Sequence, residues 1–164
     1  AELLEPEYMA LCHQLAEASA SWFGREAEPQ CIVHGDFRLD NMLFGADAAP
    51  KPLAVVDWQT AGKGAPAGDV AYFIGAGLTR EDRPKHEQAL LRFYHARLTE
   101  QGISDYSFEA LYDHYRWFSF YGMSVAFGAA MLVKQTDRGD EMFLTMLRRH
   151  AAQARDNDAL ALLP

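Results

Sequence analysis

The stretch CIVHGDFRLDNMLFG, Cys31 to Gly45, decides the fold of this chain. It places one histidine, two aspartates and one asparagine within eight residues and encloses them between two apolar runs. Buried polar groups cost free energy unless they find partners. The stretch is therefore either a tight turn or a site, held between two short strands that the pattern predicts over residues 31–34 and 42–45.

A second segment, LAVVDW (Leu53–Trp58), is β-branched and apolar, which predicts a strand ending at Asp57. The strands can bring Asp36, Asn41 and Asp57 close together. Asparagine and aspartate oxygens suit Mg²⁺, and a separate carboxylate can accept the proton of a hydroxyl nucleophile. Phosphoryl transfer needs these parts. Structural alternatives remain: Asp36 as a turn cap, Asn41 as a left-handed turn residue and Asp57 in an Asx-turn.

HGDFRLDN followed by VVDW resembles the catalytic and metal-binding segments of the aminoglycoside phosphotransferase and choline kinase-like family. The longer pattern, through GDVAYF, is most similar to ecdysteroid kinase-like proteins. Four residues separate Asp36 from Asn41, as in kinases. Trp58 and Gln59 stand where protein kinases have Phe-Gly. The resemblance covers residues 31–77 and implies the C-terminal lobe of the protein kinase-like fold.

The resemblance also implies roles for single residues. Asp36 would be the catalytic base that aligns the acceptor hydroxyl, and Asn41 and Asp57 would hold Mg²⁺ on the phosphates of ATP. Arg38 would stabilise charge on the transferred phosphate. His34 would brace the loop.

Two further residues are implied to support the site. Gly35 would allow a close backbone approach. Asp69 would support the catalytic loop through hydrogen bonds. The sequence independently predicts Asp69 as the N-cap of a helix over Val70–Gly77, and the two roles are compatible.

The rest of the chain reads as helical. Apolar periodicity predicts helices over residues 3–23, stopping at Gly24, and over 84–101, ended by Gly102. Ser107 is the predicted cap of a long aromatic helix, and residues 142–154 complete the set. The segment QTAGKGAPAGD, residues 59–69, is predicted as a loop, and its GKGAPAG part lacks the residue order of a phosphate-binding P-loop. The expected class is mainly α with a small β-hairpin element (α+β).

Composition excludes some functions. The length of 164 residues predicts one domain, residues 1–164. The net charge of −8 argues against a nucleic-acid partner. Cys12 and Cys31 form no CxxC pair, which favours a reduced, cytoplasmic setting. The apolar run Tyr115–Val133 contains Arg116 and has charged neighbours, so a buried core helix is expected rather than a membrane span.

The nucleotide-binding half of a kinase is not found in the sequence. The residues before His34 contain no Gly-rich loop, and no lysine precedes Lys51. The N-terminal lobe is therefore expected to be absent, whether the chain is a fragment, half of a split protein or a stand-alone remnant. Little or no kinase activity is expected from the chain alone. An exposed apolar face where that lobe would pack is also expected, with self-association as a consequence.

Two functions of different classes follow. The first is an ATP-dependent phosphotransferase that moves the γ-phosphate to a hydroxyl of a small molecule. The second is a catalytically silent binding or scaffold lobe that retains the motif. A metal-dependent hydrolase built on His34 is weaker, because it would need more histidine or carboxylate ligands. Most aromatic residues of the long helix are expected in the core, and the rest favour a hydroxylated, partly apolar acceptor.

Overall fold

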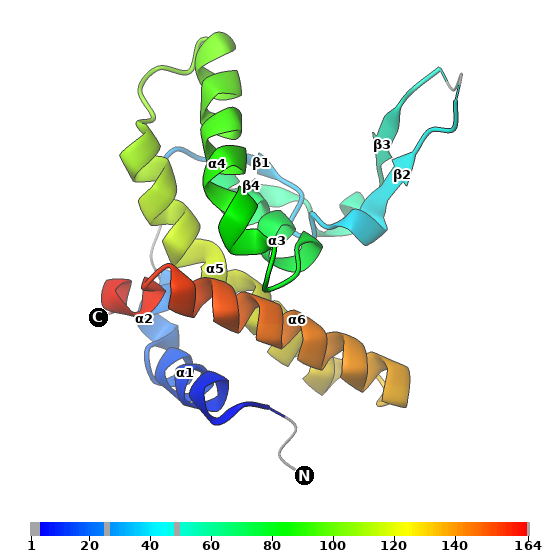
Figure 1. The fold of residues 1–164 in the computed structure, drawn as a ribbon, viewed down its shortest axis with the longest axis vertical. Coiled ribbons are helices and arrows are strands. Elements are labelled where there is room, and N and C mark those ends of the chain that lie inside the picture. Colours follow the sequence, from blue (N-terminus) through cyan, green and yellow to red (C-terminus); the bar gives the residue numbers. More distant parts are fainter. Residues whose placement is uncertain (1–3, 25–26, 48–49, 164) are drawn as a thin grey trace.

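A computed structural model describes residues 4–24, 27–47 and 50–163. Helices dominate it, and the strands are short (Figure 1). The helices are α1 (Pro6–Glu17), α2 (Ser19–Gly24), α3 (Pro66–Gly77), α4 (Arg83–Glu100), α5 (Phe108–Leu132) and α6 (Asp137–Asp156). The strands are β1 (Cys31–Val33), β2 (Met42–Phe44), β3 (Leu53–Val55) and β4 (Gly62–Gly64). Short 3₁₀ turns span Leu39–Asn41, Trp58–Thr60 and Ala159–Leu162.

Most helix boundaries follow the local signals of the sequence. Ser107 caps α5 by accepting a hydrogen bond from the amide of Ala110, as predicted. Gly102 follows α4 with a φ of 89°, a conformation that glycine adopts without strain. The segment predicted as one helix over 3–23 instead forms α1 and α2, which meet at Ala18; residue 3 lies outside the described residues.

The predicted start of α3 at Asp69 is wrong. This helix begins at Pro66, with Ala65 at the N-cap position, so Asp69 lies in its first turn. Proline is favoured at the first position of a helix, because its missing N–H has no partner there in any case. The side chain of Asp69 is thereby released for another role.

The four strands form two separate two-stranded antiparallel sheets rather than a single hairpin. β1 pairs with β4, with Ile32 opposite Lys63, and β2 pairs with β3, with Leu43 opposite Ala54. The prediction of a loop throughout residues 59–69 therefore misses β4, whose Gly-Lys-Gly sequence has low strand propensity and depends on β1 for pairing. In Figure 1 the β2–β3 hairpin projects from the helical body.

The core lies among α3, α5 and α6, which pack against one another. From α5, Tyr115, Trp117, Phe120 and Met123 are buried. Tyr112, Phe118 and Tyr121 are partly buried and pack against them, which confirms that most of the aromatic stripe is core. None of the described helices is long and apolar enough to cross a membrane. The part of the apolar run up to Ala126 packs in the core, whereas Met131, Leu132 and Val133 at its end are 85%, 87% and 58% exposed.

A buried ion-pair network attaches α4 to this core. The guanidinium of Arg83, which is 1% exposed, pairs with Glu87 and with Asp156 at the end of α6. The hydroxyl of Tyr115 donates a further hydrogen bond of 2.9 Å to the Glu87 carboxylate. A buried charge needs such partners, since an unpaired one is strongly destabilising.

His150 of α6 is fully buried against two glycines. A Cβ at Gly75 of α3 or at Gly122 of α5 would overlap the imidazole ring, so both positions require glycine for the helices to approach. Nδ1 lies 3.0 Å from Oε1 of Gln153, while Nε2 has no hydrogen-bond partner within the described residues. Burial, followed by the charges of Arg149 and Arg83, lowers the pKa of His150 to about 4.

We expect acid to weaken this core through His150. The unfolded chain binds a proton near pH 6.5 whereas the folded one does so only near pH 4, so the free energy of unfolding falls as the pH drops across that interval. The shift corresponds to a loss of about 3 kcal/mol. Urea titrations at several pH values, on the wild type and on His150→Leu, measure it. Equal losses in both proteins would contradict the prediction.

Candidate functional site

The polar loop of residues 34–41 joins β1 to β2 and is anchored on α3. One carboxylate oxygen of Asp69 accepts a 2.6 Å hydrogen bond from the amide of His34, and the other accepts a 3.0 Å bond from the amide of Gly35. The predicted hydrogen bonds between Asp69 and the loop are therefore present. Hydrogen bonds from two backbone amides to one charged carboxylate are strong and directional, so they fix the position of the first residues of the loop.

Gly35 lets the loop turn against a neighbouring segment. Its φ is 80°, and a Cβ there would lie 2.6 Å from the carbonyl oxygen of Thr60. Only glycine combines this backbone conformation with such a close approach. The hydroxyl of Thr60 donates to the carbonyl of His34 at 2.9 Å, which ties the same two segments together.

The long helix α5 provides a third anchor. The hydroxyl of Tyr121 donates a 2.6 Å hydrogen bond to the carbonyl of Gly35. Burial, and then the carboxylates of Asp69 and Asp36, raise the pKa of Tyr121, which keeps its hydroxyl protonated as a donor. The loop is thus held by α3, by the segment before β4 and by α5.

His34 is buried inside the loop rather than presented to solvent. Its Nδ1 accepts a 3.2 Å hydrogen bond from the amide of Asp36, which assigns the ring proton to Nε2, 2.9 Å from the carbonyl of Val56. The Trp58 ring covers it at a centroid distance of 4.7 Å. With both nitrogens engaged, His34 connects the loop to the chain after β3.

Asp36, Arg38 and Asn41 lie together. The side-chain amide of Asn41 donates to the backbone carbonyl of Asp36 at 2.8 Å and to its carboxylate at 2.9 Å. Nε of Arg38 lies 3.2 Å from that carboxylate, and Nη1 lies 3.2 Å from Asp40. The Asp36 side chain is 25% exposed, so its carboxylate is fixed by neighbours yet reachable from solvent.

Asp57 follows β3 by two residues, because the strand ends at Val55 and not at Asp57 as predicted. Asp57 adopts the left-handed conformation, with φ 66° and ψ 52°, which aspartate and asparagine tolerate better than most residues. The amide of Val56 donates to the carbonyl of Asn41 at 2.9 Å. Asp57 therefore directly follows Val56, the residue whose backbone amide is hydrogen-bonded to Asn41.

The side-chain oxygen atoms of Asn41 and Asp57 are of the chemical type that a hard cation binds. Among the described residues, no hydrogen bond engages Oδ1 of Asn41, and neither a hydrogen bond nor an ion pair engages the exposed Asp57 carboxylate. Within the same part of the chain, no group of three or more His, Cys, Asp or Glu side chains is arranged to hold a metal ion. Two ligands suit Mg²⁺, which keeps several waters and often binds substrate phosphates.

Sequence reasoning missed the residues that reach the loop from a distance. Thr60 is 26 positions from His34, and Tyr121 is 86 positions from Gly35. Neither residue belongs to a local motif, and Tyr121 is one of many aromatics on its helix. Only the three-dimensional packing distinguishes it.

Asp36 and Asn41, joined by a hydrogen bond and followed by Asp57 after a short strand, have the order and spacing of the corresponding residues in kinases. The chain belongs to the ecdysteroid kinase-like family, whose family model matches residues 1–103. The resemblance inferred from the sequence is thereby confirmed.

Three curated relatives show the extent of the likeness. Acyl-CoA dehydrogenase family member 10 of Mus musculus is 54% identical over 41 residues, 25% of this chain and 4% of that protein. Family member 11 of Rattus norvegicus is 34% identical over 94 residues, 50% of this chain and 12% of that protein. Family member 11 of Gallus gallus is 39% identical over 57 residues, 32% of this chain and 7% of that protein. The matches thus span a small part of these relatives, and no solved structure matches the chain.

Proposed function

We propose that this chain is the catalytic and acceptor-binding lobe of an ATP-dependent phosphotransferase that acts on a hydroxyl of a small molecule. The observation that supports it most is the link between Asp36 and Asn41, since one amide spans the backbone and carboxylate of the same aspartate. A loop so constrained presents a carboxylate for proton transfer beside an oxygen available to a cation. Membership of the kinase-like family supports the same reaction class.

In the proposed reaction, the acceptor oxygen forms a bond to the γ-phosphorus while the bond from that phosphorus to the β-bridging oxygen breaks, leaving ADP. Asp36 orients the acceptor hydroxyl and receives its proton. Arg38, already beside that carboxylate, offers positive charge to the transferred phosphoryl group. Asn41 and Asp57 would hold Mg²⁺, which neutralises phosphate charge when it is bound.

We also propose that a second lobe supplies the rest of the nucleotide site, and that residues 1–164 form a single C-terminal lobe. The support lies in large apolar side chains that are left exposed on this part of the chain. Ile32 on β1 is 81% exposed, Phe44 on β2 68% and Trp58, in the turn after β3, 52%, and Leu43 on β2 is exposed as well. A partner that covered such side chains would remove apolar surface from water. Without the second lobe, we expect the chain alone to turn over ATP poorly.

The test uses the complete natural protein that contains this chain. ³¹P NMR follows product formation from Mg-ATP with a panel of hydroxylated small molecules, and Asp57→Asn removes the charge of one proposed ligand while tolerating the left-handed backbone. We expect a loss of kcat of about 100-fold or more, because the charge that holds the cation is gone. Asp47→Asn, an exposed carboxylate beyond β2, is the matched control and should keep wild-type turnover.

The same assay separates the second candidate, a silent binding or scaffold lobe. The hydrogen bonds that hold the loop on α3 and α5 favour this candidate, because they stabilise the fold whether or not the loop is catalytic. Nucleotide binding without phosphorylated product from any acceptor would favour the silent lobe and reject the phosphotransferase. Equal turnover by the wild type and Asp57→Asn would reject the role of Asp57.

A further inference from the structure

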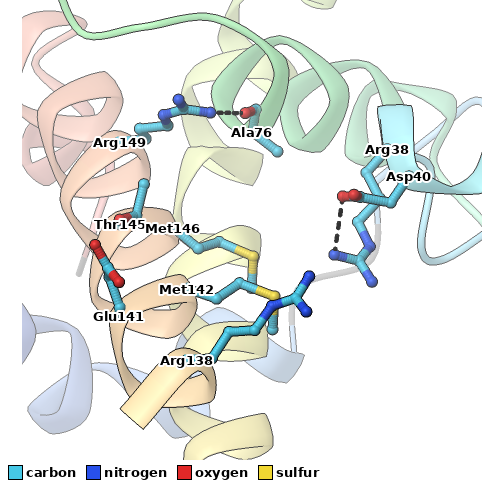
Figure 2. A pocket seen from close by; sticks show the side chains of 9 residues that line it. All are labelled: Arg38, Asp40, Ala76, Arg138, Glu141, Met142, Thr145, Met146 and Arg149. Atoms are coloured by element: carbon cyan, nitrogen blue, oxygen red, sulfur yellow. Dashed lines mark hydrogen bonds and ion pairs between the residues drawn. The ribbon is translucent and has the colours of Figure 1, made fainter.

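A cavity of about 310 Å³ lies between the polar loop and helix α6, beside the C-terminal end of α3 (Figure 2). Its volume lies at the small end of the range of ligand sites. The residues that line it are Arg38, Asp40, Ala76, Arg138, Glu141, Met142, Thr145, Met146 and Arg149. The aromatic residues of α5 expected to wall the acceptor site do not line this cavity.

Three arginines make the lining of the cavity net positive, whereas the whole chain is net negative. Arg38, Arg138 and Arg149 outnumber the acidic Asp40 and Glu141, in a protein whose net charge is −8. In Figure 2 the guanidinium groups of Arg38 and Arg138 approach the same space from opposite sides, whereas the Glu141 carboxylate lies across α6 from Arg38. A local excess of positive charge favours an anion.

The arginines differ in how far they are already engaged. Arg38 contacts Asp36 and Asp40, and Nη1 of Arg149 donates to the carbonyl of Ala76 at 2.5 Å. For Arg138, neither a hydrogen bond nor an ion pair is found within residues 4–24, 27–47 and 50–163. An unengaged guanidinium can bind a carboxylate or phosphate through two parallel N–H donors.

The remaining lining is apolar and adaptable. Met142 and Met146 lie one helical turn apart on α6 and project between Arg138 and Arg149 in Figure 2. Thioether side chains are flexible and pack well against irregular apolar groups. The cavity therefore combines anion-binding groups with a surface for a short hydrocarbon segment.

The cavity is also connected to the proposed catalytic base. Arg38 lines it and places Nε 3.2 Å from the Asp36 carboxylate, so one side chain separates the cavity from the group that would receive the proton. The cavity and the proposed base therefore share Arg38 as a contact residue.

We propose that this cavity holds the acceptor, and that the acceptor is a hydroxylated molecule carrying an anionic oxygen group on an apolar segment. This inference rests on the proposed phosphotransferase function. The anionic group binds Arg138, and the apolar segment packs on Met142 and Met146. A polycationic acceptor is disfavoured, because three guanidinium groups would repel it.

The test measures KM and kcat separately in the complete natural protein. The probes are medium-chain hydroxycarboxylic acids, their neutral methyl esters, and glycerol 3-phosphate beside glycerol. Arg138→Gln should raise KM for the anionic acceptors about 10-fold, with kcat within about twofold, because it removes one charge-assisted contact. KM for the neutral esters should not change. Arg97→Gln, an exposed arginine on α4, makes the same charge change elsewhere and should have no effect.

Binding is measured as well, by calorimetry with the carboxylic acids that lack the hydroxyl and cannot react. If phosphoryl transfer fails for every acceptor but Arg138→Gln still weakens binding of these acids, the proposed function falls and the anion site stands. If transfer occurs but neutral esters are preferred, or Arg138→Gln acts like Arg97→Gln, the cavity inference is overturned and the phosphotransferase stands. A preference for glycerol 3-phosphate over the carboxylic acids would support the anion-binding role of Arg138 and overturn the packing of an apolar segment on Met142 and Met146.

Discussion

Replacing Asp36 by Asn is expected to lower kcat about 1,000-fold, with little change in the fold. General-base groups typically contribute 10²- to 10⁴-fold to a rate. An amide at position 36 still offers an oxygen to the side-chain amide of Asn41, which now bonds the carboxylate at 2.9 Å. It cannot receive a proton at neutral pH, and it no longer attracts Arg38. The loss should therefore fall on turnover rather than on stability.

The measurement compares steady-state kcat with thermal unfolding followed by circular dichroism. Asp113→Asn is the control, since Asp113 is an exposed carboxylate on α5 that pairs with Arg116 far from the loop. It should leave both kcat and the unfolding midpoint near the wild-type values. If Asp36→Asn retained more than about a tenth of the wild-type kcat, proton transfer to Asp36 would have to be abandoned.

Replacing Asp69 by Ala is expected to destabilise the protein by about 3 kcal/mol, because two backbone amides lose a charged acceptor together. The amides of His34 and Gly35 bond this one carboxylate, at 2.6 and 3.0 Å. Alanine leaves both donors without their partner at a half-buried site. The loop that carries Asp36 should also become less ordered, so kcat should fall even though Asp69 is a positioning residue rather than a catalytic one.

Urea unfolding gives the stability change, and two variants make it specific. Asp69→Asn retains one acceptor oxygen and should lie between the wild type and Asp69→Ala. Asp137→Ala removes a carboxylate from the first turn of α6, where it has the same relation to a helix dipole but no contact with the loop. Similar destabilisation by Asp69→Ala and Asp137→Ala would mean that Asp69 acts only through the dipole of α3 and not through its hydrogen bonds to the loop.

Local chemistry explains which elements could be predicted. Ser107 and Gly102 act through their own hydrogen bonds and backbone angles, so the sequence predicts them well. Asp69 has the same capping chemistry, yet its carboxylate is used by amides 34 and 35 positions away, and α3 begins at Pro66 instead. A capping preference is worth about 1 kcal/mol, which two charge-assisted bonds exceed.

The candidate site likewise has local features that could be predicted and long-range contacts that could not. The spacing of Asp36 and Asn41 is local, and the two side chains meet as that spacing predicts. The strand of Gly62–Gly64 exists because β1 pairs with it, and Tyr121 reaches Gly35 because α5 crosses the loop. Neither contact leaves a periodic or compositional signal in the sequence. The arginine cavity is equally invisible there, since its members come from the loop and from α6.

The projecting β2–β3 hairpin has a dynamic consequence. Its ladder pairs three residues of each strand, and an isolated pair of this length is marginal in water. The loop before it is clamped to the helices, whereas Asp57 depends on the hairpin for its placement, through the bond from Val56 to Asn41. Breathing of this ladder would move Asp57 relative to Asn41 while the helical core stays folded. A partner that covered Phe44 and Leu43 would therefore also hold Asp57 in its position relative to Asn41 for longer, by stabilising the hairpin.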